Sequence, residues 1–209
     1  MYLNIALPKG RIGEDSYKIL KKLGYSSAEY ENKDRKLVFI NEEKKIKYFL
    51  VKSSDVPVYV ERGAADIGIV GKDVLMESKA NVYELLDLGF GKCRFAVAAP
   101  VDFVDNYEKK LVVATKYINV AREYFEKQER DIDLIKLNGS VELGPLVNLS
   151  DVIVDIVETG STLKANNLEE REKIADISAR LIVNRNSYRF KNEIINKLIK
   201  EIEGEIKND

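Results

Sequence analysis

Short apolar runs rich in β-branched residues alternate along the chain with amphipathic stretches. The runs predict strands at Tyr2–Leu7, Lys36–Ile40, Ile46–Lys52, Asp66–Val70, Arg94–Ala99, Leu111–Thr115, Ile132–Leu137, Val152–Val157 and Ala179–Val183. Strands that alternate with helical patterns are typical of α/β proteins, and this is the fold class that the pattern predicts.

Apolar residues at helical spacing lie between these runs. They predict helices over about Glu14–Leu23, Ile118–Lys127 and Val141–Val147, a short helix from Pro57 to Gly63, a helix after Gly71–Asp73 and a closing helix over about Ser187–Glu203. Gly24 is the expected stop of the first helix, since glycine commonly follows the last helical turn.

The chain is expected to form two lobes without a flexible tether, because it contains no long Gly/Ser linker. A composition shift near Leu88–Gly91 marks a first crossover, and Ile177–Leu181 marks the return. We therefore expect residues 1–90 with 179–209 to form lobe I, and residues 91–178 to form lobe II.

Composition restricts the chemistry that the protein can perform. The 209 residues include no histidine and one cysteine, Cys93, which excludes imidazole bases, catalytic Ser-His pairs and cysteine-cluster metal sites. The 34 Lys and Arg residues balance 35 Asp and Glu residues, which argues against a nucleic-acid binder with a broad basic surface. No apolar run approaches a membrane span, and the N-terminus lacks a signal peptide's basic region, so we expect a cytoplasmic protein that does not enter membranes.

The segment from Asp155 to Leu163 is the strongest candidate for a binding site. An apolar strand runs into Thr159-Gly160-Ser161-Thr162, where backbone N–H groups and hydroxyls converge as in a phosphate cradle. Asp155 and Glu158 beside it suit a sugar diol, so the segment is consistent with a ribose-5-phosphate site. The alternative is an ordinary strand-to-helix turn with a Thr or Ser N-cap.

Several cations and glycines lie where a ligand can bind an α/β sheet. Lys9-Gly10-Arg11 follows the first strand, and ligands bind open α/β sheets beyond the carboxyl ends of strands. Arg35 and Lys52 flank the next two strands, and Arg94 begins an apolar one. Gly71 ends a buried strand, where close packing against a helix explains a glycine equally well. Neither G-x-x-x-x-G-K-[ST] nor G-x-G-x-x-G occurs, so neither a P-loop nor a Rossmann site is indicated.

Together these segments resemble the ATP phosphoribosyltransferase family, which catalyses the first step of histidine biosynthesis. The matching segments occur in order along nearly the whole chain: Ala6–Arg11, Ser54–Pro57, Ala64–Gly71, Cys93–Phe95, Ala114–Tyr117, Leu137–Glu142, Asp155–Leu168 and Val183–Arg185. Two departures are Lys52, where the family is expected to carry arginine, and Asn148, which replaces a glycine.

The resemblance implies a two-lobed fold of the periplasmic-binding-protein type (type II), with the active site in the cleft between the lobes. It places the 5-phosphate of phosphoribosyl pyrophosphate on the Glu158–Leu163 loop, that is on Glu158, Thr159, Gly160, Ser161, Thr162 and Leu163, with Asp155 and Glu158 near the ribose. Lys9, Arg11, Arg35 and Arg94 would act on ATP or pyrophosphate from the other lobe, and Gly10 and Gly71 would line the ATP site. Mg²⁺ would enter with the substrates and not on protein ligands.

Chain length bears on regulation within this resemblance. Long members of the family continue into a histidine-sensing domain, whereas this chain ends soon after the last predicted helix and resembles the short form. The resemblance then implies a homodimer of catalytic chains in a hetero-octamer with a regulatory subunit similar to histidyl-tRNA synthetase, and little direct inhibition by histidine. The alternatives are a solute-binding protein and another enzyme of the same fold, such as a prephenate dehydratase or a porphobilinogen-deaminase-like protein.

Overall fold

The computed structural model describes residues 2–31 and 35–208, and the chain divides into two compact units. Unit 1 comprises residues 1–91 and 178–209, and unit 2 comprises residues 92–177. The chain therefore passes from unit 1 to unit 2 at Gly91–Lys92 and returns at Ile177–Ser178. Within the described residues, no helix combines the length and the apolar character that crossing a bilayer requires.

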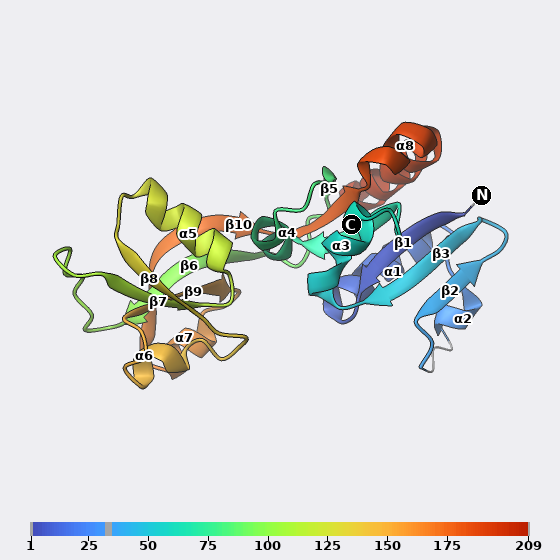
Figure 1. Cartoon of the computed structure of the whole chain (residues 1–209). Helices are drawn as coiled ribbons and strands as arrows, with labels where there is room; N and C mark the ends of the chain where they lie inside the picture. Colours follow the sequence, from blue (N-terminus) through green and yellow to red (C-terminus); the bar gives the residue numbers. More distant parts are fainter. Residues whose placement is uncertain (1, 32–34, 209) are drawn as a thin grey trace. The chain divides into compact units, whose positions relative to one another are not determined.

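Unit 1 is built on a six-stranded mixed sheet with the order β2-β3-β1-β4-β11-β5 (Figure 1). Its strands are β1 (Leu3–Pro8), β2 (Val38–Asn41), β3 (Ile46–Val51), β4 (Ile67–Gly71), β5 (Tyr83–Asp87) and β11 (Ala179–Val183). β1 runs parallel to β3 and β4, whereas β11 is antiparallel to both of its neighbours. The carboxyl ends of β1, β3 and β4 consequently meet at one edge of the sheet.

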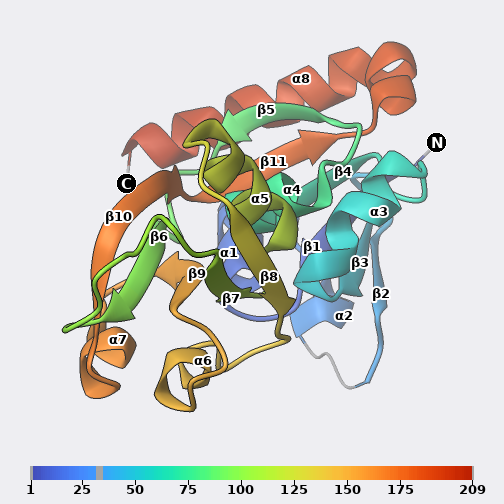
Figure 2. The same cartoon turned by 60° about the vertical axis from the view of Figure 1, so that its left-hand side comes forward.

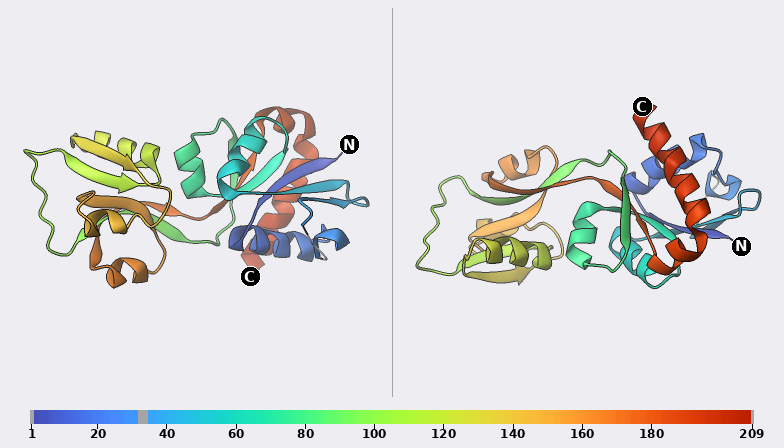
Figure 3. Two further views of the ribbon diagram at one scale, coloured as in Figure 1. Left: turned by 60° about the horizontal axis from the view of Figure 1, so that its bottom comes forward. Right: turned by 90° about the horizontal axis from the view of Figure 1, so that it is seen from above.

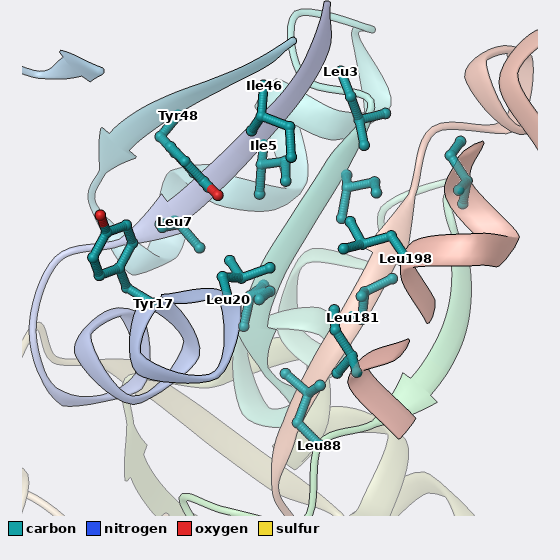
Figure 4. Packing of buried hydrophobic residues seen from close by; sticks show 14 of the residues in the cluster. Leu3, Ile5, Leu7, Tyr17, Leu20, Ile46, Tyr48, Leu88, Leu181 and Leu198 are labelled. Atoms are coloured by element: carbon teal, nitrogen blue, oxygen red, sulfur yellow. The ribbon is translucent and has the colours of Figure 1, made fainter. Parts of the chain in front are cut away.

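Helices cover both faces of the unit 1 sheet. Side chains of a strand point alternately to its two faces, and β1 carries apolar side chains on both. Leu3, Ile5 and Leu7 of β1 enter one core with Leu20 and Leu198 (Figure 4). Ala6 lies in a second core on the opposite face. The first core packs against α1 (Arg11–Lys22), α2 (Ala28–Glu31) and α8 (Arg185–Asn208), and the second against α3 (Val56–Glu61) and α4 (Lys72–Ser78), with a 3-10 turn at Ser53–Asp55.

Unit 2 is built on a five-stranded sheet with the order β10-β6-β9-β7-β8. Its strands are β6 (Cys93–Pro100), β7 (Leu111–Thr115), β8 (Ile132–Lys136), β9 (Val152–Val157) and β10 (Leu168–Ile177). Figures 1 and 3 show α5 (Ile118–Lys127) on one face of this sheet, with α6 (Leu143–Leu146) and α7 (Ser161–Ala165) on the other. β7, β8 and β9 are parallel, so their carboxyl ends also meet at one edge.

The predicted elements are found with shifts of one to three residues at most of their ends. Four predicted elements match at both ends, namely β7, β9, β11 and α5. α1 begins at Arg11 and not at Glu14, because Gly10 (φ 95°) turns the chain directly into the helix. The helix predicted at Val141–Val147 is a single turn, and α8 extends beyond both of its predicted ends, with a non-helical residue at Lys191.

Three elements are missing from the sequence prediction: α2, β5 and β10. β5 and β10 are edge strands, and β10 carries many charged residues. An edge strand exposes one side to solvent and needs little apolar character, so its sequence resembles that of a loop. Figure 2 shows β5 beside β11, at the edge of the unit 1 sheet, with α8 close to it.

Candidate functional site

The first group of predicted residues lies at the carboxyl edge of the unit 1 sheet. Lys9 and Gly10 link β1 to α1, and this connection is tight: a Cβ at Gly13 would lie 1.7 Å from the carbonyl oxygen of Pro8. Only glycine therefore fits at position 13 with this geometry. The close approach places the first turn of α1 directly against the end of β1, beside Lys9.

A pocket of about 480 Å³ opens beside this connection. Lys9, Arg35 and Lys36 bring three cations to its wall, and Glu14 brings one carboxylate. The remaining lining residues are Pro8, Gly10, Tyr30, Leu37 and Leu50. A pocket with several cations and an apolar wall suits a ligand that joins phosphates to a flat ring.

The pocket brings together three predicted residues: Lys9, Gly10 and Arg35. Two further predicted residues are not in its lining. Arg11 is the first residue of α1, and Gly71 ends β4 and begins the turn into α4. A Cβ at Gly71 would lie 2.1 Å from Oδ1 of Asp73, so a larger residue there would require the Asp73 side chain to move. Tyr30, Leu37 and Leu50 were not predicted, because these residue types carry no chemical signature of a binding site.

The second group lies in unit 2, at the edge where β9 ends. Glu158 and Thr159 follow the strand, Gly160 adopts a left-handed conformation (φ 77°), and α7 begins at Ser161. The hydroxyls of Thr159 and Ser161 lie 2.9 Å apart, and the backbone N–H of Ser161 donates to Oγ1 of Thr159 at 3.3 Å. Three polar groups of the predicted cradle thus face one another within one turn.

The start of α7 differs from an ordinary capped helix. Its N-cap residue is Gly160, which has no side chain, and the Thr159 hydroxyl one residue earlier accepts a hydrogen bond of 3.3 Å from the N–H of Ser161. The first N–H groups of a helix have no partner within the helix, so an anion could take the place of the Thr159 hydroxyl as their acceptor. The residue at the N-cap position is thus a glycine and not the Thr or Ser of the alternative, although the Thr159 hydroxyl does bind the first N–H of the helix.

Exposure separates the predicted residues of this loop into two kinds. Glu158, Thr159, Ser161 and Thr162 are exposed, and Asp155 is half-buried. Leu163 is buried in the core with Val141 and Val157, so its side chain cannot touch a ligand. The expectation that Leu163 binds substrate is thus limited to its backbone, because the side chain is needed to hold α7 on the sheet.

Asp155 lies on the sheet face that α6 and α7 cover. It is two residues from Ile153 and from Val157, which are both in that core, and alternate residues of a strand share a face. Its partner across the antiparallel pair is Ala96, whose side chain is one methyl group. Oδ1 of Asp155 accepts a hydrogen bond of 2.8 Å from the N–H of Ile156.

Arg94 corrects one expectation, because it belongs to unit 2 and not to the lobe of Lys9 and Arg35. It is paired in the sheet with Val157, the last residue of β9, which brings it beside the Glu158–Leu163 loop. Its Nε donates to both carboxylate oxygens of Glu170 at 2.9 and 2.8 Å, and its Nη2 donates to Oε2 at 2.5 Å. The hydrogen bonds from Arg94 lower the pKa of Glu170, and those to Glu170 raise the pKa of Arg94.

Proteins hold metal ions with sets of acidic, thiolate or imidazole side chains that lie close together. Across residues 2–31 and 35–208 there is no group of three or more Asp, Glu or Cys side chains close enough to hold one. Asp155 and Glu158 are the acids nearest to the candidate phosphate loop in the sequence. A metal ion at this loop would therefore take most of its oxygen ligands from a bound ligand and from water.

The fold places the chain in a broad class, the α/β proteins built from two units in the manner of periplasmic binding proteins. The periplasmic aliphatic sulphonate binding protein SsuA of Escherichia coli shares this fold, with a TM-score of 0.59 over 98% of this chain and 72% of that chain at 12% identity. At that identity the likeness concerns the fold alone.

Closer similarity defines the family. The family model for ATP phosphoribosyltransferase (HisG) matches residues 52–204. The ATP phosphoribosyltransferase of Brachyspira hyodysenteriae is 56% identical over 96% of this chain and 98% of that protein. A solved structure of the ATP phosphoribosyl transferase (HisG:HisZ) complex from Thermotoga maritima matches with a TM-score of 0.87 and 36% identity, over 99% of this chain and 100% of that one. The chain belongs to the ATP phosphoribosyltransferase family, whose members are glycosyltransferases of histidine biosynthesis.

Proposed function

We propose that this chain transfers the 5-phosphoribosyl group of phosphoribosyl pyrophosphate to N1 of the adenine of ATP, with release of pyrophosphate. The phosphoribosyl substrate binds the Glu158–Leu163 loop of unit 2, and ATP binds the cationic pocket of unit 1. The turn from Thr159 to Thr162 carries this proposal, because its hydroxyls and N–H groups can surround a phosphate.

Different groups of the unit 2 segment bind the phosphate and the ribose of the phosphoribosyl group. Thr159, Ser161 and Thr162 donate hydroxyl and backbone hydrogen bonds to the 5-phosphate. Gly160 turns the chain so that these donors point the same way, a conformation that a side chain would strain. Asp155 and Glu158 accept hydrogen bonds from the ribose hydroxyls, a task that suits carboxylates.

The pocket in unit 1 supplies charge for ATP and for the leaving group. Lys9 and Arg35 approach phosphate oxygens from its wall, and Gly10 leaves room beside them. Arg11 and Gly71, at the same edge of the sheet, complete the proposed ATP site. Tyr30, Leu37 and Leu50 offer an apolar surface for the adenine ring.

The reaction needs no protein base. N1 of adenine carries a free lone pair, which forms the new bond to C1 of the ribose as the bond from C1 to the pyrophosphate oxygen breaks. The chain contributes orientation and positive charge for the departing pyrophosphate, the two contributions expected of a site without histidine. Phosphoribosyltransferases generally use a metal ion, and we propose that Mg²⁺ enters bound to the pyrophosphate of the substrate and neutralises part of its charge.

The test is pyrophosphate release by the full chain. We expect release only when ATP, phosphoribosyl pyrophosphate and Mg²⁺ are all present, with one phosphoribosyl-ATP formed for each pyrophosphate. If the chain bound phosphoribosyl pyrophosphate without turnover, even with the regulatory subunit present, a solute-binding role would be favoured instead. Turnover of a different substrate pair would favour another enzyme of this fold.

Assembly and location follow from the same family. We propose a homodimer of catalytic chains within a hetero-octamer, together with a regulatory subunit similar to histidyl-tRNA synthetase. The Thermotoga maritima relative supports this, because its structure is of a HisG:HisZ complex. We place the enzyme in the cytoplasm, where ATP is available as a substrate.

A further inference from the structure

The pair formed by Arg94 and Glu170 connects the edge strand β10 to the loop that follows β9. Two of the three guanidinium nitrogens of Arg94, Nε and Nη2, are bound to the Glu170 carboxylate. The third, Nη1, donates at 3.3 Å to the backbone carbonyl oxygen of Glu158. One side chain thus links a charged strand to the first residue of the loop.

The strand register explains how residues that are distant in the sequence reach one another. Glu170 is paired with Ala98, four residues along β6 from Arg94, and residues four apart in a strand share a face. Four residues span about 13 Å, so both side chains must extend along the strand to meet. The residue between them on that face is Ala96, whose methyl group leaves the path open.

The contacts of Arg94 leave it poorly suited to bind substrate directly. The carboxylate of Glu170 already neutralises the guanidinium, and the side chains of Arg94 and Glu170 are only 32% and 26% exposed. A substrate phosphate would have to displace Glu170 to obtain a two-pronged contact. The remaining nitrogen is directed at the backbone of the loop and not at its hydroxyl-bearing side chains.

We propose that Arg94 and Glu170 form a clamp that positions the Glu158–Leu163 loop for phosphoribosyl pyrophosphate, with Arg94 acting through the carbonyl of Glu158. This inference rests on the proposed function of the loop. Glu170 orients the guanidinium, and the guanidinium holds the end of β9 where the loop begins. Both are positioning residues, and neither touches substrate.

The clamp and a direct ligand role for Arg94 predict opposite effects of Glu170→Gln. In a clamp, losing either partner frees the loop, so Glu170→Gln and Arg94→Gln each weaken binding of phosphoribosyl pyrophosphate about tenfold, the usual size of a lost charge-assisted hydrogen bond. The double variant is then little worse than either single variant, because both changes remove one unit. If Arg94 were a ligand, Glu170→Gln would release it and leave binding unchanged or tighter.

Arg171→Gln is a matched control on the same strand. Arg171 is also 32% exposed, makes an ion pair with Glu169 at 3.0 Å, and donates to the carbonyls of Pro100 and Val101. These contacts lie at the other end of the β6–β10 pair, away from the loop. We expect this variant to bind phosphoribosyl pyrophosphate like the unaltered chain.

The experiment is calorimetric binding of phosphoribosyl pyrophosphate with Mg²⁺ to the full chain, together with hydrogen exchange of the loop amides. The clamp predicts weaker binding and faster exchange at residues 158–163 in both single variants, with a thermal transition as in the Arg171→Gln control. Equal affinity in all variants, or a loss confined to Arg94→Gln, would overturn the clamp while the unaltered chain still binds. Failure of the unaltered chain to bind would overturn the proposed function of the loop as well.

Discussion

In unit 1 the carboxylate of Asp66 lies 2.7 Å from the ammonium nitrogen of Lys191, at the one non-helical residue within α8. The Asp66 side chain is 5% exposed and also accepts hydrogen bonds from the N–H of Asn4 and the hydroxyl of Ser187. A single carboxylate therefore joins β1, the start of β4 and the first turns of α8.

This arrangement predicts a large loss of stability for Asp66→Ala. The change removes the charged partner of a poorly exposed ammonium, which keeps the carbonyl of Tyr2, and takes away the acceptor of two further donors. We therefore expect the free energy of unfolding to fall by about 3 kcal/mol. Lys18→Ala is the control, because it breaks an exposed ion pair with Asp15 and should cost less than about 1 kcal/mol. Urea unfolding measures both, and similar small losses would contradict the role assigned to Asp66.

Variants of the unit 2 loop should lose affinity for one substrate and keep it for the other. Glu158→Ala and Thr159→Ala remove a ribose acceptor and a phosphate donor, so each should weaken phosphoribosyl pyrophosphate binding about tenfold and leave ATP binding unchanged. Lys164→Ala, at an exposed position of α7 just after the loop, should leave both affinities unchanged. Calorimetry with each ligand decides the matter, and unchanged affinity in both loop variants would rule out this assignment.

Variants of the unit 1 pocket should instead lose affinity for ATP. Arg35→Ala and Lys9→Ala each remove a cation from the wall and should raise the dissociation constant of ATP about tenfold, with a smaller effect at high salt. Lys44→Ala removes an exposed cation from the turn between β2 and β3 and serves as the charge-matched control. Equal effects of Arg35→Ala and Lys44→Ala would show that net charge matters and the pocket does not.

Tyr25 predicts a specific loss of stability at high pH. Burial and then a hydrogen bond of 2.5 Å to Glu201 raise its pKa from 10.0 to about 12. Because the folded-state pKa exceeds the unfolded one, the stabilisation is complete below about pH 10 and is lost as the pH rises toward 12.

Two variants separate the causes of that shift. Tyr25→Phe should flatten the fall in unfolding free energy between about pH 10 and about pH 12, and Glu201→Gln should flatten it only in part, since burial remains. Chemical unfolding at several pH values measures the slopes. A slope that is the same in the unaltered chain and in Tyr25→Phe would show that Tyr25 titrates alike in both states.

Elements with buried apolar side chains could be predicted from the sequence. Elements that are stabilised mainly by a neighbouring strand could not. β7 and β9 are apolar runs with clear ends, so their bounds are confirmed. β10 (LEEREKIADI) has few apolar residues, and its pairing with β6 contains two irregularities. Its stability comes from the apolar strand beside it, and no local pattern records that.

The candidate site divides in the same way. The strand-turn-helix chemistry around Gly160 can be recognised locally, and Asn148, noted as an unusual replacement for glycine, has a positive φ of 57° that asparagine tolerates well. The partner of Arg94 could not be predicted, because the shift in register between Glu170 and Glu172 appears only in the folded sheet. The apolar wall of the unit 1 pocket was missed for a similar reason, since Tyr30, Leu37 and Leu50 meet only in the fold.

The position of β11 has a consequence for synthesis of the chain on the ribosome. This strand lies between β4 and β5 in the sheet of unit 1, yet it follows the whole of unit 2 in the sequence. β5 has no neighbour in the sheet other than β11, so it must wait unpaired until residues 179–183 have emerged. Unit 2, by contrast, is one continuous segment whose strands all emerge before β11. During translation unit 2 can therefore be complete while the sheet of unit 1 still lacks its fifth and sixth strands.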